Sequence, residues 1–306
     1  MKILWTSAIA STLFFTVTIS EYASAITLYS GSGLPATDGY LAPGAICTST
    51  INLVGPCSSG SKFAPGTVNQ TSVSGGVQVE TSSQLSNNYT VYSGYSNYIP
   101  ANSIPPTFNN AASYVNPTFN ANILNQTTGY TLTFTVSLDS TESNISNLTS
   151  APRAVFSVTA INSDNTGIEL GFLPTSIFAH SASFGIPAEI TTALDTSVAA
   201  TYTLTVFNNN YSLSAGATQL ISGNLQSYVF NNTTSNPPLP FNPYTTPSFI
   251  FFGDNTSEAS GKFTLGSVNL DTTPIPFEFS PTYVLLAIGT GLAIKNWRKK
   301  AKDKIK

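Results

Sequence analysis

An alternation of apolar and hydroxyl-bearing residues is the feature that most constrains the fold. In Tyr130–Leu138, apolar side chains take every second place, and Thr or Ser lies between them. Arg153–Ile161 and Tyr202–Val206 also carry apolar residues at every second position. Because successive side chains of a strand point to opposite faces, this period of two predicts strands with one buried face and one solvated face.

Other patterns indicate further strands. Ser248–Phe252 is apolar on both faces, which predicts a central strand covered on both sides. In Phe263–Leu270 the alternation changes phase at Gly266, which predicts a β-bulge. Weaker patterns place strands at Thr27–Ser30, Val77–Thr81, Tyr89–Tyr92, Ile168–Phe172, Ile177–His180, Tyr211–Leu213 and Ser227–Phe230.

These strands predict an all-β fold. Within residues 26–270, no segment has a helical period with caps at its ends. Turn sequences such as Asp164–Gly167 separate the strands, which favours an antiparallel β-sandwich. About 245 residues suit one jelly roll of about 12–14 strands. Two long loops are expected, Pro100–Asn125 and Asn231–Pro247.

Charge is scarce and unevenly distributed. Only 8 % of the 306 residues are charged, against about 25 % in a typical soluble domain. Residues 26–275 hold three basic and 11 acidic side chains, a net charge of −8. Three scattered cations exclude a nucleic-acid-binding face, which needs clustered Lys and Arg. The low charge also disfavours an ordinary cytosolic enzyme. The other basic residues are Lys2 and seven of the last 12 positions: Lys295, Arg298, Lys299, Lys300, Lys302, Lys304 and Lys306.

The first 25 residues have the order of a secretory signal peptide. Lys2 precedes an apolar stretch, Ile3–Ile19, and Ala23-Ser24-Ala25 provides an A-x-A cleavage site. We expect cleavage after Ala25, so that the mature chain begins at Ile26. The alternative is an uncleaved N-terminal anchor.

The C-terminal segment predicts one membrane helix, over residues 282–297. Tyr283–Ile294 would span about 18 Å, which is short of a hydrocarbon core of about 30 Å. Phe277–Trp297 would span about 31 Å, with Trp297 at the interface and Lys295 reaching toward water. Arg298, Lys299 and Lys300 begin a basic tail over residues 298–306, which would stay cytoplasmic. The alternative, a buried core helix, does not explain the cations.

A short motif precedes this helix within a linker over residues 271–281. The triad Pro276-Phe277-Glu278 is followed by Ser280-Pro281, the apolar run and the basic tail. This order resembles the CTERM class of bacterial sorting tails, in its cyanobacterial PFE variant. The resemblance implies export, then anchoring or sorting, with either cleavage by a membrane sorting protease or retention as an anchor. The Pro-Glu-Pro triad of the PEP variant is missing.

A second resemblance covers most of the predicted sandwich (residues 26–270), from about Leu28 to Leu270. Its segments are Thr127–Tyr130, Gly167–Phe172, Ile177–Ala179, Tyr202–Leu213, Phe249–Ser257 and Phe263–Val268. In this order they resemble the concanavalin A-like, laminin G-type jelly roll of bacterial and cyanobacterial choice-of-anchor surface proteins. The resemblance implies a lectin- or glucanase-like sandwich without an assigned activity.

The two cysteines, Cys47 and Cys57, are separated by nine residues. In an exported chain, an even and close pair predicts a disulfide. Such a bond would stabilise the fold by about 2–3 kcal/mol in the chain-entropy treatment. The alternative is a pair of free thiols.

No catalytic constellation stands out in the sequence. A glucanase would need paired carboxylates, but Glu169 has no acidic residue two or four positions away. His180 is the only histidine, and no G-x-S-x-G motif presents a nucleophile for it. We expect a surface or strand-end histidine rather than a catalytic one. No phosphate-binding loop and no His/Cys metal cluster are found, so no cofactor is expected.

Calcium is the one ion that the sequence raises, because related sandwiches often bind it with loop carboxylates. The candidate ligands Asp164 and Asn165, and Asp254 and Asn255, follow predicted strands. The alternative is that these residues only form turns.

A row of tyrosines gives a weak signal for carbohydrate. Tyr89, Tyr92, Tyr95 and Tyr98 recur at every third position, among Ser and Asn. Rings of this kind could stack on a glycan. The alternative is that they pack within the protein.

The sequence thus predicts an exported, C-terminally anchored or sorted cell-surface protein without enzymatic activity, for interaction, adhesion or the envelope matrix. Its domain would lie outside the cytoplasmic membrane, with the tail cytoplasmic unless it is cleaved. Expected partners are the membrane, the export machinery and a sorting protease. The alternative is a carbohydrate-binding module for exopolysaccharide, and the remote alternative is a glucanase-type hydrolase.

Overall fold

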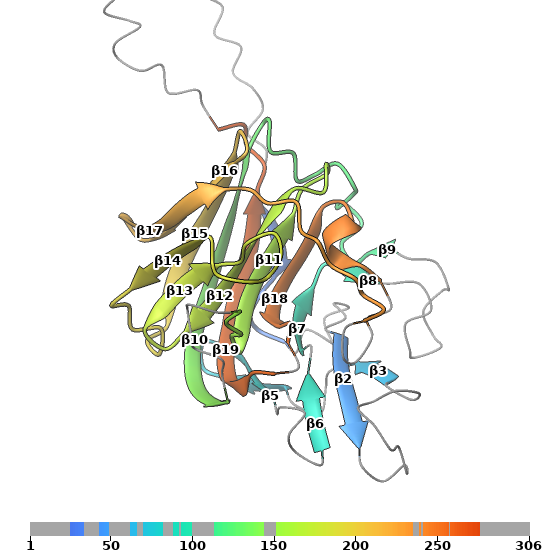
Figure 1. Cartoon of the computed structure of the whole chain (residues 1–306), viewed down its shortest axis with the longest axis vertical. Coiled ribbons are helices and arrows are strands. Elements are labelled where there is room, and N and C mark those ends of the chain that lie inside the picture. Colours follow the sequence, from blue (N-terminus) through green and yellow to red (C-terminus); the bar gives the residue numbers. More distant parts are fainter. Residues whose placement is uncertain are drawn as a thin grey trace, which may run out of the picture.

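A computed structural model describes residues 25–33, 43–48, 62–65, 70–81, 88–91, 93–99, 113–143, 151–234, 239, 241–256 and 258–275. This part of the chain is all-β, as expected, and forms a two-layer antiparallel sandwich (Figure 1). The one helical element in the described part is a 3₁₀ turn, Pro243–Thr245. The two main sheets together hold 14 strands, at the top of the expected number.

The first sheet has eight strands. Its order is β17-β16-β15-β10-β19-β5-β4, and β1 pairs with β19 beside this path. The strands are β1 (Ile26–Tyr29), β4 (Gln70–Val73), β5 (Gly76–Thr81), β10 (Tyr130–Ser143), β15 (Ala200–Phe207), β16 (Asn210–Ala215), β17 (Thr218–Asn224) and β19 (Ser260–Asp271).

The second sheet has six strands, in the order β14-β13-β12-β11-β18-β7. The strands are β7 (Ser93–Ser96), β11 (Phe156–Ile161), β12 (Gly167–Leu173), β13 (Ser176–Ala179), β14 (Glu189–Thr192) and β18 (Phe249–Asp254). Two small sheets add β2 (Pro43–Thr48), β3 (Lys62–Pro65), β6 (Asn88–Val91), β8 (Tyr98–Ile99) and β9 (Ser113–Tyr114).

Aromatic side chains join the two main sheets. Phe134 of β10 lies 4.9 Å from Phe252 of β18, measured between ring centroids, and also contacts Phe156 and Phe172 of the second sheet. These inward-facing residues belong to one large cluster of buried side chains. The alternation in the sequence therefore marks the faces that form the core, because every second residue of a strand points inward.

Two specific expectations are confirmed. Strand β18 is buried along its whole length and pairs with β11 and β7, as a central strand should. Strand β19 contains the predicted bulge, because its pairing with β10 steps from Val268 opposite Phe134 to Leu265 opposite Val136. Gly266 lies at this step, where one strand holds an extra residue.

The strand expected at Ser227–Phe230 is wrong. Gln226 forms only an isolated bridge with Gly167, and the chain then leaves the sheet. The N–H of Val229 donates to the carbonyl of Ala182 in a neighbouring loop. The aromatic alternation of this segment thus serves packing on a sheet face rather than strand pairing.

The outer face of the six-stranded sheet carries a third layer, which we call the aromatic cover: Phe184, Tyr228, Phe230, Phe241 and Tyr244. These rings pack on Ile161, Phe249 and Phe251, which point outward from β11 and β18. Most of the cover comes from the segment between β17 and β18, which passes over the sheet (Figure 1).

The two loops expected to be long contact each other beside this cover. The hydroxyl of Ser248, next to the second loop, donates to the carbonyl of Ala121 in the first, over 2.9 Å. The hydroxyl of Tyr114 donates to the carbonyl of Pro247. Both loops therefore contribute to the packing around the outer face of the second sheet.

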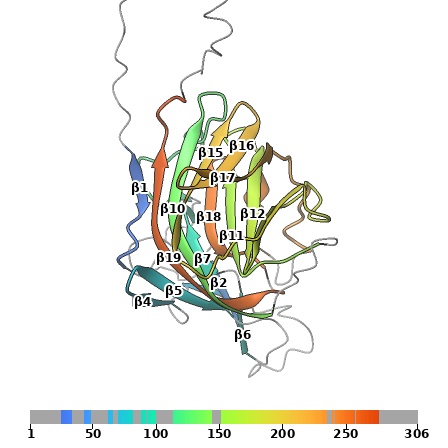
Figure 2. The ribbon, with the colours of Figure 1, turned by 90° about the vertical axis from the view of Figure 1, so that its left-hand side faces the viewer.

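The first and the last strand positions of the sandwich, Ile26 and Leu270, lie side by side. Ile26 pairs with Leu270, so β1 begins where β19 ends (Figure 2). Beyond β19, the N–H of Ile275 donates to the carbonyl of Thr128. The chain thus enters and leaves the sandwich at one place.

Several predictions fall outside the described residues. They are the signal peptide apart from Ala25, the sorting motif Pro276-Phe277-Glu278 with Pro281, the helix and tail with Lys295, Trp297, Arg298, Lys299 and Lys300, and Cys57. For Cys47 only the backbone is described, in β2, so the disulfide stays a prediction. In the residues that are described, no helix is long and apolar enough to cross a membrane.

Candidate functional site

A buried glutamate lies on the outer face of the six-stranded sheet. Leu170 and Phe172 of β12 point into the core, so Glu169, one position away, points outward under the aromatic cover. In the sheet, Glu169 lies opposite Thr159 of β11. The N–H of His180, just after β13, donates to the backbone carbonyl of Glu169 over 2.9 Å.

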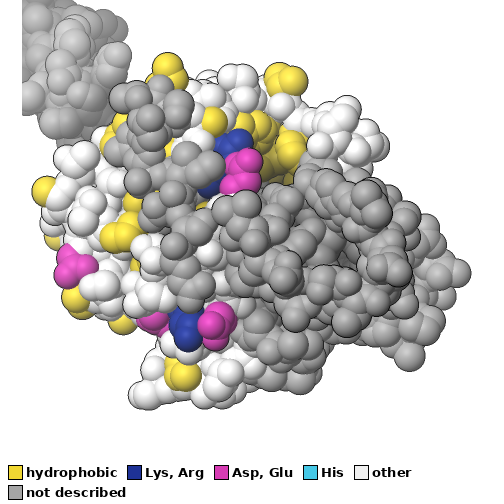
Figure 3. Space-filling model, turned by 60° about the horizontal axis from the view of Figure 1, so that its bottom comes forward, with side chains coloured by type: hydrophobic (Ala, Val, Ile, Leu, Met, Phe, Trp, Pro, Cys, Tyr) yellow, Lys and Arg dark blue, Asp and Glu magenta, His cyan; other side chains and the backbone are white. Residues whose placement is uncertain are grey.

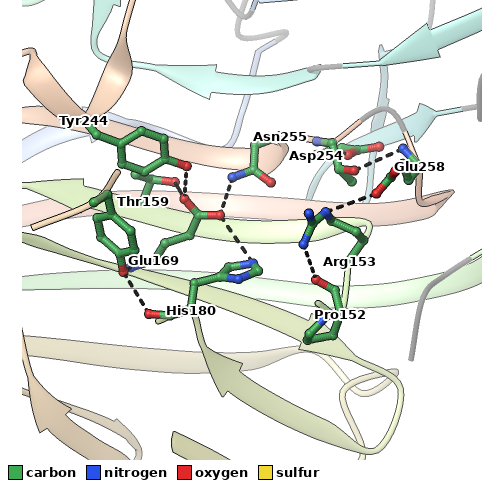
Figure 4. Close-up of polar contacts among 11 residues, drawn as sticks. Pro152, Arg153, Thr159, Glu169, His180, Tyr244, Asp254, Asn255 and Glu258 are labelled. Atoms are coloured by element: carbon green, nitrogen blue, oxygen red, sulfur yellow. Dashed lines mark hydrogen bonds and ion pairs between the residues drawn. The ribbon is translucent and has the colours of Figure 1, made fainter. Parts of the chain in front are cut away.

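Four side chains converge on the Glu169 carboxylate (Figure 4). Asn255 donates to Oε1 over 2.8 Å, and Nε2 of His180 lies 3.5 Å from the same oxygen. The hydroxyls of Tyr244 and Thr159 both donate to Oε2. With 2 % of its surface exposed, Glu169 is sealed from water, and donors from its own chain replace the hydration shell.

Two tyrosines of the aromatic cover, Tyr228 and Tyr244, form hydrogen bonds with Glu169. The hydroxyl of Tyr228 accepts the N–H of Glu169 over 2.7 Å and donates to the carbonyl of His180 over 3.3 Å. Burial, and then the nearby charge of Glu169, raise the pKa values of Tyr228 and Tyr244 well above 10. Both side chains therefore stay protonated and hold the cover on the sheet as hydrogen-bond donors.

His180 is buried and uncharged at neutral pH. Burial lowers the pKa of its imidazole below the ordinary 6.5, Glu169 counteracts this, and the charge of Arg153 adds to the lowering. Phe178 and Phe184 lie against the ring, at centroid distances of 4.9 and 5.4 Å. Nδ1 is buried without a hydrogen-bond partner. The expectation of a surface histidine is wrong, although the strand-end position is right.

Two ion pairs are formed by described residues, one in contact with the second sheet and one on the first sheet. Nε of Arg153 lies 3.1 Å from Oε2 of Glu258, and both side chains are partly exposed. Lys262 forms a similar pair with Glu80 over 3.2 Å. In the view of Figure 3, the basic side chains that can be seen each lie against an acidic one. Each of these two cations is therefore compensated by a neighbouring carboxylate.

The hydrogen bonds around Glu169 suit a residue that stabilises the fold rather than one that acts on a substrate. A general acid or base must lie within hydrogen-bond reach of a proton on a substrate. Here the carboxylate oxygens already accept hydrogen bonds from side chains of the protein. The site joins β11, β12 and β13 to the cover through one buried carboxylate.

The calcium candidates lie in two different settings. Asp164 accepts from the hydroxyl and N–H of Thr166 and from Gln126 over 2.7–3.0 Å, the pattern of a turn-forming residue. Partial burial raises the pKa of Asp164, but the hydrogen bonds from Thr166 and Gln126 together outweigh it, so the pKa is lowered. Asp254, at the end of β18, is fully buried, and burial raises its pKa well above 3.8. Among the described residues, no group of three or more His, Cys, Asp or Glu could hold a metal ion.

The tyrosine row does not form a glycan platform where it is described. Tyr95 is fully buried and stacks on Tyr29 at 5.9 Å, so its predicted glycan contact is wrong. Tyr98 is half-buried between Tyr114 and Phe241. Tyr92 lies outside the described residues, and Tyr89 is described only as backbone in β6. A period of three cannot keep side chains on one face of a strand, whose period is two.

Sequence reasoning missed most partners of Glu169. Tyr244, Tyr228 and Thr159 showed no functional signal, and Asn255 was considered only as a calcium ligand. Tyr244 is 75 positions from Glu169 along the chain. One weak signal existed, because an apolar central strand such as β18 needs something to cover its outward face.

Comparisons with known proteins give little beyond the fold. The chain matches no known protein family. It also matches no curated protein sequence.

Three kinds of solved structure are similar to part of the chain. A Trypanosoma rangeli sialidase with 2,3-difluorosialic acid is 13 % identical with a TM-score of 0.39, covering 68 % of this chain and 27 % of the sialidase. Alginate lyase A1-II′ of polysaccharide lyase family 7 is 11 % identical with a TM-score of 0.33, covering 60 % of this chain and 81 % of the lyase. Sheep galectin-11 is 10 % identical with a TM-score of 0.29, covering 47 % and 90 %.

The chain thus spans about a quarter of the length of the sialidase that it matches. TM-scores below 0.5 give no ground for transferring an activity. The sandwich is established by the strand pairing of this chain itself.

Proposed function

We propose that this chain is an exported surface protein whose β-sandwich serves interaction and not catalysis. The observation that carries this proposal is the environment of Glu169. The carboxylate that lies beside the chain's single histidine is enclosed by donors from its own chain and lies under Tyr244. A carboxylate held in this way stabilises a fold, because substrate would have to replace each of these donors.

The position of the chain ends supports surface attachment. Ile26 and Leu270 lie side by side, so a tail that follows residue 275 would leave the sandwich beside its N-terminal strand. An anchored domain would then present its opposite end and both sheets outward. The resemblance of the tail to CTERM sorting tails, and of the segments to choice-of-anchor surface proteins, agrees with this arrangement.

Catalysis is tested with the segment 26–275 on a panel of polysaccharides, with reducing-end release and unsaturated-product absorbance as readouts. We expect no turnover by the wild type or by Glu169→Gln. Turnover by the wild type that Glu169→Gln abolishes, while its unfolding curve stays cooperative, would make the protein an enzyme and overturn the proposal.

Attachment is tested by cell fractionation of the full chain and of a chain ending after Ile275, which keeps the contact of Ile275 with Thr128. We expect the full chain with the membrane or envelope and the shortened chain released in soluble form. Equal release of both would show that the tail is not an anchor.

A second candidate, a carbohydrate-binding module, is favoured by the polar face of the eight-stranded sheet. Thr131, Thr133 and Thr135 of β10 lie opposite Thr205, Thr203 and Thr201 of β15, in rows across neighbouring strands. Hydroxyl groups at strand spacing, about 4.8 Å apart, could bind the hydroxyls of a neutral polysaccharide.

Glycan-array binding tests this candidate. Binding that the pair Thr133→Val and Thr203→Val abolishes, and that Thr218→Val at the sheet margin leaves intact, would support it. No binding at high protein concentration would count against it.

A further inference from the structure

Three buried polar side chains lie on inward faces of the two sheets, at the end of the sandwich opposite its chain ends. Gln70, Thr81 and Asp254 are 5 %, 1 % and 0 % exposed. Each has a polar atom with no hydrogen-bond partner: both amide atoms of Gln70, Oγ1 of Thr81 and Oδ2 of Asp254. Such atoms are rare in folded proteins and require a physical explanation.

Strand geometry brings these groups to one place. Val79 of β5 points into the core, and Gln70 of β4 lies opposite it, so Gln70 points the same way. Thr81 is two positions after Val79 and shares its inward face. From the other sheet, Asp254 is two positions after the inward-facing Phe252. Burial raises the pKa of Asp254, and the side chain of Thr81 lies close enough to the carboxyl group to lower it in part.

The carboxyl group is the most costly of the three to bury. One oxygen, Oδ1, accepts the N–H of Thr256 over 2.9 Å, while Oδ2 has no donor. The two cations whose ion pairs are described at this end, Arg153 and Lys262, are paired with Glu258 and Glu80. A buried carboxylate without a counter-charge must take up a proton or bind a cation.

We infer that Oδ2 of Asp254, Oγ1 of Thr81 and Oε1 of Gln70 bind one hard monovalent cation, sodium or potassium. All three are oxygen ligands, which hard cations prefer. A single carboxylate balances a single positive charge, whereas a divalent ion would leave one buried charge uncompensated. The cation also gives two otherwise unpartnered neutral oxygens an electrostatic partner. This site differs from the calcium site considered from sequence, because Asp254 points into the sandwich and Asp164 has no part in it.

The test uses the purified full-length chain in detergent. The temperature of unfolding is compared in sodium, potassium, calcium, magnesium and choline chloride at equal ionic strength. We expect sodium or potassium at about 100 times its dissociation constant to raise the midpoint by about 5–10 °C over choline. The two monovalent arms identify the ion.

Two variants locate the effect. Asp254→Asn should lose the cation-dependent rise, and Asp164→Asn, at the other end of the sandwich, should keep it. If Asp254→Asn does not fold, Thr81→Val serves instead, because it removes one ligand oxygen at nearly constant volume. It should need at least about ten times more cation for the same rise.

Two results would overturn the inference. The first is a midpoint that is equal in choline, sodium and potassium, with Asp254→Asn as stable as the wild type, which would assign Asp254 as a neutral acid. The second is a rise with calcium alone that depends on Asp254, which would replace the monovalent site by a divalent one. Neither result bears on the proposed surface function, which does not use this site.

Discussion

At the scale of single residues, Glu169 shows how one carboxylate can organise a surface layer. Its two oxygens accept hydrogen bonds from three separate segments of the chain and lie beside His180, and its own N–H is bound by Tyr228. Removing one donor leaves the buried carboxylate with fewer hydrogen bonds to replace its hydration, which is costly for a charged group inside the protein.

Tyr244→Phe should therefore lower the free energy of unfolding by about 1–3 kcal/mol, because Oε2 of Glu169 loses a hydrogen bond inside the protein. Chemical denaturation measures the loss. A double-mutant cycle with Glu169→Gln is the control, and a coupling energy near zero would show that the hydroxyl and the carboxylate do not act together.

His180 predicts a specific dependence of stability on pH. Its pKa is lowered in the folded state, so between the folded value and 6.5 the unfolded chain binds more protons. The free energy of unfolding should then be highest above pH 6.5 and decrease as the pH falls through this range.

Comparison with His180→Gln isolates the histidine contribution, since this is the only histidine of the chain. The variant should lose the decrease toward acid. By NMR, the single imidazole of the wild type should titrate below 6.5, and a higher value would contradict its burial.

At the scale of elements, the pairing of β7 with β18 depends on two glycines. Gly94 lies opposite Gly253 in this pair. A Cβ atom at Gly94 would lie 2.1 Å from the carbonyl oxygen of Phe252, and one at Gly253 would lie 2.3 Å from that of Ser93. These contacts are with backbone atoms, so the strands would have to separate to admit a side chain.

Gly94→Ala should accordingly destabilise the fold by about 1–3 kcal/mol, through the displacement of β7 from β18. Gly185→Ala is the matched control, because its nearest atom would be the hydroxyl of Ser183 at an ordinary 3.6 Å. Its effect should stay within about 0.5 kcal/mol. Equal midpoints in urea for both variants would contradict the close approach of the two strands.

At the scale of the whole molecule, the sandwich rests on rings that reach from one sheet to the other. Phe134 is fully buried and contacts four aromatic side chains: Phe156, Phe172, Tyr202 and Phe252. Three of these four lie in the opposite sheet, so this one position connects both layers.

Phe134→Ala should cost about 3–5 kcal/mol, through lost contacts and the cavity left in the core. Thr133→Ala, on the outer face of the same strand, should cost less than about 1 kcal/mol. Urea unfolding of both variants measures the difference. A loss of less than 1 kcal/mol for Phe134→Ala would show that the core repacks around the gap.

Shortening the chain tests whether residues 272–275 belong to the folded domain. A chain ending after Asp271 loses the hydrogen bond from Ile275 to Thr128 and the contact of the Ile275 side chain with Gly129. It should unfold at a lower temperature than the chain that ends after Ile275. Identical midpoints would place the end of the folded domain at β19.

The sequence by itself determined the position and the buried face of the strands that have a clear alternation or a continuous apolar run. The alternation in β10, the apolar β18 and the bulge at Gly266 all appear where the pattern predicted them. These features can be predicted because side chains of a strand alternate between its two faces, so the residues next to one another in the sequence suffice to show the pattern. The concentration of basic residues in the tail is likewise a property of the sequence alone.

Only the tertiary structure decided what covers each face. It buried Tyr95 and His180, placed Tyr244 on Glu169 from 75 positions away, and turned Asp254 toward Thr81. A local pattern shows that a face must be covered but not by which segment. That choice depends on contacts between distant parts of the chain, which form only when both sheets pack together.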